Sequence, residues 1–182
     1  IANTAVAVGR EIEYQIVQVQ DENFVIAKDL AAGLLEDYIV LKDLKGTDLL
    51  GSRYQPPFAL DQFKEFISEK LHSILEADFV NTSDGSGIVH LAPAFGADDM
   101  KTCRLNSLPV INPVLANGEF DDSFELIKGQ FFKDADKTII RDLIARNLMY
   151  KEVAYQHSYP HCWRCKTPLM YYAQPAWYIK TT

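Results

Sequence analysis

Short runs of apolar residues, separated by polar residues, recur in the first part of the chain and predict β-strands. These runs lie at residues 4–8, 13–19, 24–27 and 38–41. The polar residues 21–23 between the second and third runs are typical of a turn, so a β-hairpin is expected there. A short helical turn is expected at 30–35.

The remainder of the chain combines helical patterns with further short strands. Strands are expected at 73–80, 88–92 and 109–114, and helices at 60–71, 97–105 and 134–148. The predicted buried side of the last helix consists of Ile139, Ile140, Leu143 and Ile144. Many short strands with few helices predict an α+β fold, mainly β with peripheral helices, and we expect a β-barrel-like domain.

A change in composition near residue 156 indicates a second, smaller element. Residues 156–171 contain two cysteines, two histidines and two prolines. We therefore expect a main domain over 1–155 and a cysteine-containing return segment over 156–182. The chain begins within one apolar run and stops within another, which predicts that it is a piece of a larger protein.

Composition and charge narrow the class of protein. The chain has 182 residues, 48% of them hydrophobic and 12% aromatic, which is enough for a buried core and too apolar for a disordered chain. A net charge of −7 argues against a protein that binds the phosphate backbone of a nucleic acid through its own positive charge. No apolar run approaches the roughly 20 residues that cross a bilayer, so we expect a soluble protein without a membrane partner.

The three cysteines predict a reducing compartment, which we take to be the cytoplasm. Cys162 and Cys165 have the C-x-x-C spacing of a zinc knuckle, but a closed site needs four ligands. Half of a Cys₄ site completed from elsewhere is one hypothesis, and two free surface thiols is the other. Cys103 is interpreted as a filler of the core or the surface.

The best local candidate for chemistry is His90 with Asp99. A histidine in a strand, followed nine residues later by a carboxylate at a helix start, can bring both groups to one pocket. The imidazole would contact a substrate carbonyl, and the carboxylate would pair with a substrate ammonium. The structural alternative is a satisfied buried histidine and an aspartate that caps the helix, with Asp98 as the natural cap.

Two glycines precede this histidine, at Gly85 and Gly87. Glycines of this kind can bring backbone N–H groups to a phosphate. The P-loop and dinucleotide fingerprints need more glycines than this segment has, and the P-loop also needs a Lys-Ser/Thr pair. A tight turn before the strand is therefore expected.

Three stretches together resemble the inserted editing domain of isoleucyl-tRNA synthetases, which are class I aminoacyl-tRNA synthetases. The most specific stretch, at 85–99, reads GSGIVHLAPAFGADD; the others are 2–8, ANTAVAV, and 157–169, HSYPHCWRCKTPL. The resemblance spans nearly the whole chain. Valyl and leucyl relatives share the glycine turn but lack this histidine. The resemblance implies the editing-domain fold of the valyl, isoleucyl and leucyl enzymes.

The resemblance also implies a function, the hydrolysis of the ester that joins valine to the 3′ end of the isoleucine tRNA. A site that selects isoleucine rejects valine poorly, because one methylene is worth only about 1–3 kcal/mol, a magnitude established for this enzyme family. By position, Asp99 would bind the α-ammonium of the misattached amino acid. His90 would line the pocket and exclude isoleucine, and Asn3 would orient the substrate or the attacking water.

Two departures from the family pattern matter. Its threonine-rich peptide, whose hydroxyls form part of the pocket, would lie immediately before Ala2, so the piece alone is expected to be weak or inactive. Phe95 stands where some members carry a second histidine, and it is interpreted as an apolar wall that contacts the substrate.

The implied partners are the tRNA 3′ end carrying valine and the rest of a monomeric synthetase. Hydrolysis needs no cofactor, whereas a structural zinc and the ATP and magnesium of the catalytic core belong to the parent enzyme. Two other functions stay open: a non-catalytic module that binds the tRNA acceptor end, and a zinc-dependent nucleic-acid module.

Overall fold

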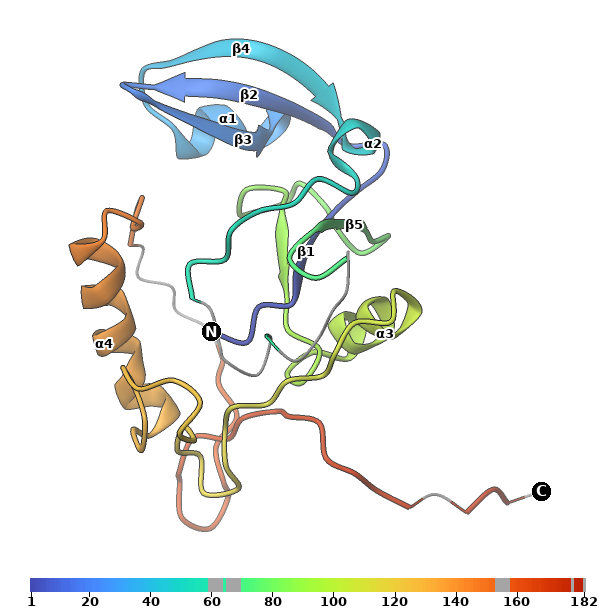
Figure 1. Ribbon diagram of the computed structural model, residues 1–182, viewed down its shortest axis with the longest axis vertical. Helices are drawn as coiled ribbons and strands as arrows, with labels where there is room; N and C mark the ends of the chain where they lie inside the picture. The colour runs from blue at the N-terminus through green and yellow to red at the C-terminus, as the bar shows by residue number, and fades with distance from the viewer. Residues whose placement is uncertain (59–63, 65–69, 153–157, 178, 182) are drawn as a thin grey trace.

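The computed structural model describes residues 1–58, 64, 70–152, 158–177 and 179–181 (Figure 1). Its strands are β1 (Ala5–Val8), β2 (Glu13–Val19), β3 (Glu22–Ala27), β4 (Tyr38–Lys45), β5 (Ile74–Glu76) and β6 (Val89–Leu91). Its helices are α1 (Lys28–Leu34), α2 (Gly46–Leu49), α3 (Ala97–Leu105) and α4 (Phe132–Ala145).

The first sheet is antiparallel, with strand order β3-β2-β4. It lies at the top of Figure 1, with α1 against it. The predicted hairpin is confirmed, but its turn is tighter than expected: β3 already begins at Glu22, and Gln20 adopts a positive φ of 53°. The predicted helical turn and the strand from residue 38 are also confirmed, and β4 extends to Lys45.

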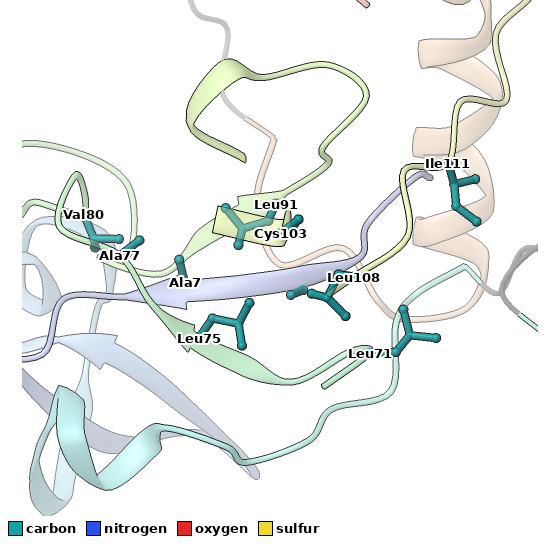
Figure 2. Packing of buried hydrophobic residues seen from close by; sticks show 10 residues of the cluster. Ala7, Leu71, Leu75, Ala77, Val80, Leu91, Cys103, Leu108 and Ile111 are labelled. Carbon is teal, nitrogen blue, oxygen red and sulfur yellow. The ribbon is translucent and has the colours of Figure 1, made fainter. Parts of the chain in front are cut away.

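The second sheet is mixed, with strand order β5-β1-β6. β1 pairs in parallel with β5 and antiparallel with β6. The side chains of Leu75, Leu91 and Cys103 gather around β1 to form the largest part of the core (Figure 2). Cys103 is fully buried, so its interpretation as a core filler is confirmed.

Tyr14 of β2 ties the two sheets together. Its side chain is fully buried, and its hydroxyl donates a hydrogen bond of 2.7 Å to the carbonyl of Gly87, just before β6. Gly87 has a positive φ of 76°, and an added Cβ would lie 2.4 Å from the Cβ of Ala27. Both observations require glycine, and they confirm the prediction that this segment is a tight turn.

The fold class is confirmed as α+β with few helices, but the described residues form two three-stranded sheets and no closed barrel. The predicted strand at 109–114 is wrong: only an isolated bridge joins Val114 to Phe120. Pro109 and Pro113 lack the N–H groups that a strand ladder needs. The strand predicted at 73–80 is confined to β5.

Helix α3 has the predicted bounds, whereas α4 departs from its predicted packing. Ile139, Ile140 and Leu143 are only partly buried, and Ile144 is 54% exposed. The buried residues of the helix, Phe132 and Ala135, lie in and next to its first turn. In Figure 1 it stands apart from the sheets.

Two sequence predictions concern residues that the structure does not describe. Most of the helix predicted at 60–71 and the domain boundary near 155 lie outside the described residues. Among the helices that are described, none is both long enough and apolar enough to cross a membrane.

Candidate functional site

Four chain segments far apart in sequence lie side by side next to the second sheet. Backbone hydrogen bonds run from Tyr54 N to His72 O (3.0 Å), from His72 N to Thr4 O (2.9 Å) and from Thr4 N to Leu91 O (2.9 Å). These bonds continue the β5-β1-β6 pairing beyond the start of β1. They bring the residue before Thr4 next to His90.

The alternation of side chains along β6 sets the direction of His90. Val89 and Leu91 belong to the core, whereas His90 pairs across the sheet with Val6 and is exposed at the surface. Nδ1 of its ring lies 2.7 Å from Nδ2 of Asn3. His90 is therefore not the fully buried histidine of the structural alternative, although Asn3 satisfies its Nδ1.

Asn3 is the centre of a hydrogen-bond network. Its side-chain amide also donates to the carbonyl of Ala5 (2.8 Å), and its Oδ1 accepts a hydrogen bond from the hydroxyl of Tyr54. Its own carbonyl lies 3.1 Å from Nε2 of His72. Asn3 is 9% exposed, and the network satisfies its polar atoms, as a buried amide requires.

The Asn3 contacts determine the protonation of His90. The carbonyl of Ala5 can only accept, so the nitrogen of the Asn3 amide must face it. The same nitrogen faces His90, so Nδ1 of the imidazole has to accept a hydrogen bond. A neutral His90 with its proton on Nε2 satisfies this geometry, and that N–H is the donor available to a ligand.

Asp99 lies in the first turn of α3, three positions after the N-cap Gly96. Its Oδ2 accepts a hydrogen bond of 2.9 Å from the backbone N–H of Ala92. The alternative of a capping aspartate is wrong, because no side chain caps this helix. Asp99 instead ties α3 to the end of β6, two residues after His90.

The pKa shifts agree with this arrangement. Although part of its surface is exposed, the protein around the His90 ring removes enough solvent to lower its pKa; the ammonium of Ile1 lowers it further, and the charge of Asp99 acts in the opposite direction. Burial raises the pKa of the Cys103 thiol to about 11, and the charge of Asp99 adds to this shift. Asp99 is therefore close enough to act electrostatically on both His90 and the core thiol.

Phe95 lines a cavity that the other three candidate residues do not line. It lines a cavity of about 250 Å³, together with Pro93, Ala94, Gly96, Ala97, Met100 and Tyr171–Ala173. Neither His90, Asp99 nor Asn3 lines this cavity. A larger groove of about 1150 Å³ lies between the β2–β3 turn and residues 147–151, and it likewise contains none of the three.

Cys162 and Cys165 lie on one tight turn. The backbone N–H of Cys162 bonds to Thr167 O, and the N–H of Lys166, which has a positive φ of 61°, bonds to Cys162 O, both at 2.9 Å. Hydrogen bonds from Thr167, with a further one from Cys162, lower the pKa of Cys165 to about 7, which favours a metal-binding thiolate. The described residues contain no cluster of three or more metal ligands, so the turn offers two.

Sequence reasoning missed Tyr54 and His72. Both contact Asn3, and their rings pack edge to face with centroids 5.9 Å apart. Burial lowers the pKa of His72 and raises that of Tyr54. No motif or spacing marks either residue, because the backbone pairing that brings them to Asn3 is long-range.

Comparison with known proteins gives close sequence relatives. No protein-family model matches the chain. Curated proteins named isoleucine–tRNA ligase match it at 47% identity in Thermobifida fusca, 45% in Thermus thermophilus and 41% in Clostridium novyi, over 99–100% of this chain. The chain spans 17% of the length of each of these relatives.

The crystal structure of GlLeuRS-CP1 has a similar fold. It matches with a TM-score of 0.63 and 13% identity, covering 85% of this chain and 79% of that one. CP1 denotes connective peptide 1, the inserted domain of this synthetase class. The sequence relatives confirm the predicted resemblance to isoleucyl-tRNA synthetases, and the structural match confirms the fold class.

Proposed function

We propose that this chain, homologous over its whole length to a segment of isoleucine–tRNA ligases, is the domain that hydrolyses valine from wrongly charged isoleucine tRNA. The observation that carries the proposal is the placement of His90, Asn3 and Asp99 around the end of β6. There the Asn3 amide contacts the imidazole of His90, and the carboxylate of Asp99 is fixed to the backbone N–H of Ala92, two residues after His90.

Each group has a role in this proposal that its contacts support. Asp99 uses Oδ2 to accept the Ala92 N–H, and its negative charge attracts the α-ammonium of the valyl group. The Nε2–H of His90 donates to the ester carbonyl oxygen and stabilises the negative charge that develops there. Asn3 holds the ring in the tautomer that makes this possible.

The reaction needs no protein nucleophile. The oxygen of a water molecule adds to the ester carbonyl carbon, and the bond from that carbon to the ribose oxygen then breaks. The water loses one proton and the ribose oxygen gains one, so the products are free valine and a tRNA with an intact 3′ end. The proposal needs no metal or cofactor for this step.

The remainder of a larger synthetase is the proposed partner that holds the body of the tRNA. The net charge of −7 makes this chain a poor ligand for the phosphate backbone by itself. The proposed contact is therefore confined to the aminoacylated end of the tRNA. The part of the chain after residue 156 would return toward the rest of the synthetase.

Cys162 and Cys165 are proposed as two ligands of a structural zinc ion that this larger synthetase completes. Their shared turn and the lowered pKa of Cys165 support the proposal. Zinc analysis of the full-length ligase tests it, with Cys162→Ser as the variant. Loss of one zinc per chain in the variant is expected, and unchanged zinc content would contradict the assignment.

Release of valine from Val-tRNA(Ile) by the full-length ligase tests the proposed function. We expect rapid release that requires Asp99, while aminoacylation with isoleucine continues in the Asp99→Ala variant. If that variant clears valine at the normal rate, hydrolysis does not depend on this site. If it loses tight binding of the acceptor end but not the hydrolysis rate, the domain is a binding module only.

A further inference from the structure

We propose that Tyr54 is a positioning residue that acts through Asn3 to keep His90 in the neutral form with its proton on Nε2. The effect of Tyr54 on hydrolysis rests on the proposed function. Its effect on the tautomer of His90 does not, because it follows from contacts within the protein. Three side chains carry it, and they come from three segments that are distant in sequence.

The first step is the orientation of the Asn3 amide. Rotation of this amide by half a turn would place Oδ1 against the carbonyl of Ala5, two acceptors in contact. It would also exchange the atom that faces the hydroxyl of Tyr54. The acceptor-only carbonyl of Ala5 sets the orientation, with Oδ1 toward Tyr54 and Nδ2 toward Ala5 and His90. In this orientation Oδ1 is the acceptor for the hydroxyl proton of Tyr54, and that bond would be lost on rotation.

The second step is the effect of that orientation on His90. The two protons of Nδ2 are directed to the carbonyl of Ala5 and to Nδ1 of His90. A proton on Nδ1 would meet a donor, so the amide opposes both the imidazolium and the other neutral tautomer. The single ring proton is thereby placed on Nε2.

The third step is the anchoring of Tyr54 and Asn3 themselves. The backbone of Tyr54 bonds to that of His72, whose backbone N–H bonds to Thr4 O. The His72 ring contacts both the ring of Tyr54 and the carbonyl of Asn3. Backbone hydrogen bonds therefore hold the segment that carries Tyr54 in place, and the hydroxyl of Tyr54 donates the hydrogen bond to Oδ1 of Asn3.

Other charged and titratable groups act on His90 from the neighbouring elements. Asp99 approaches from α3 and favours the imidazolium, while the ammonium of Ile1 opposes it. Tyr54 and His72 both contact Asn3, which lies between them and His90. The amide network therefore favours the neutral form of His90, whereas Asp99 favours the imidazolium. If the network is lost, the charge of Asp99 raises the pKa of His90.

The test combines nitrogen NMR of the histidine rings with hydrolysis kinetics. The chain has four histidines, so His90→Gln assigns the His90 signals. In the unmodified chain we expect one ring nitrogen, Nδ1, to be unprotonated across neutral pH. In Tyr54→Phe we expect mixed tautomers and a higher His90 pKa, and in Asn3→Asp a pKa increase of about one unit or more.

Tyr14→Phe is the matched control. It also removes a tyrosine hydroxyl that donates to a buried acceptor, the carbonyl of Gly87, but this hydroxyl does not contact Asn3. Loss of stability alone would act alike in both variants. We expect Tyr14→Phe to leave the His90 tautomer and pKa unchanged.

The kinetic measurement uses Val-tRNA(Ile) and the full-length ligase. We expect Tyr54→Phe to lower kcat for deacylation by about fivefold to tenfold with little change in KM. If Tyr54→Phe leaves both the His90 tautomer and kcat unchanged while the unmodified ligase hydrolyses Val-tRNA(Ile), the positioning role is wrong. If the tautomer shifts but the unmodified ligase does not hydrolyse Val-tRNA(Ile), the proposed function fails and the role of Tyr54 in setting the tautomer stands.

Discussion

The carboxylate of Asp99 lies directly against the backbone of Gly96, in space that any larger residue would occupy. A Cβ added to Gly96 would lie 2.7 Å from Cγ of Asp99 and 2.8 Å from its Oδ1. The φ of Gly96 is −135°, which any residue adopts, so glycine is needed here for space alone. The position of the Asp99 carboxylate, the proposed ammonium-binding group, thus depends on the absence of a side chain at Gly96.

Gly96→Ala is therefore expected to displace Asp99 and weaken its bond to Ala92. The predicted result is a 10-fold to 100-fold loss, roughly, in kcat/KM for Val-tRNA(Ile) hydrolysis, with a stability loss of about 1–3 kcal/mol. Gly33→Ala in α1 is the control, because nothing lies within 4 Å of its added Cβ. That variant should keep full hydrolysis, and equal losses in the two variants would contradict the account.

Asp99→Asn is the second test, because it keeps the shape of the side chain and removes its charge. An amide oxygen can still accept the Ala92 N–H, so the fold should persist. Without the negative charge, the α-ammonium of the valyl group loses its partner. We expect KM for Val-tRNA(Ile) to rise by at least about 10-fold in the full-length ligase while isoleucine activation is unchanged. An unchanged KM would remove the proposed role of Asp99.

His90→Ala tests whether this ring also excludes the larger amino acid. The ring stands on the exposed side of β6, where it would occupy space next to the bound valyl group. Its removal should enlarge the site and permit hydrolysis of correctly charged Ile-tRNA(Ile). The measurement is the deacylation rate of that tRNA by the variant. Continued full protection of Ile-tRNA(Ile) would contradict the exclusion role.

The lowered pKa of His90 and His72 predicts how stability depends on pH. Loss of solvent around the two rings lowers both pKa values below the ordinary 6.5, so the folded chain binds fewer protons than the unfolded chain near and below that pH. The contribution of the two neutral histidines to the free energy of unfolding is complete above pH 6.5. It is lost as the pH falls from 6.5 through their folded-state pKa values. Thermal unfolding between about pH 8 and about pH 5 should show this decrease. A smaller decrease is expected for His90→Asn, and identical profiles would contradict it.

Much of the local structure could be predicted from the sequence, because it depends on nearby residues. The bounds of β2 and α3 follow the alternation and helical signals of their own segments. The prediction of a strand at 109–114 was wrong because it followed the apolar residues and gave too little weight to two prolines, which cannot donate hydrogen bonds to a strand ladder. Ile144 was expected to be buried, but the buried residues of α4, Phe132 and Ala135, lie near its start, which a periodic pattern does not reveal.

The candidate site was predictable only where it is local. His90 and Asp99 lie within one short motif, and their relation to Ala92 follows from the turn between β6 and α3. The contact of Asn3 with His90 joins residues 87 positions apart and entered only through the family resemblance. Tyr54 escaped prediction because a tyrosine in a loop carries no signal of the strand pairing that places it.

A structure of the chain with a non-hydrolysable mimic of 3′-valyl-adenosine tests the central claim most directly. The account predicts that the amino group of the mimic lies within hydrogen-bond distance of the Asp99 carboxylate and that its carbonyl oxygen faces Nε2 of His90. A mimic bound instead in the cavity lined by Phe95 and Tyr171, with its amino group away from Asp99, would contradict it.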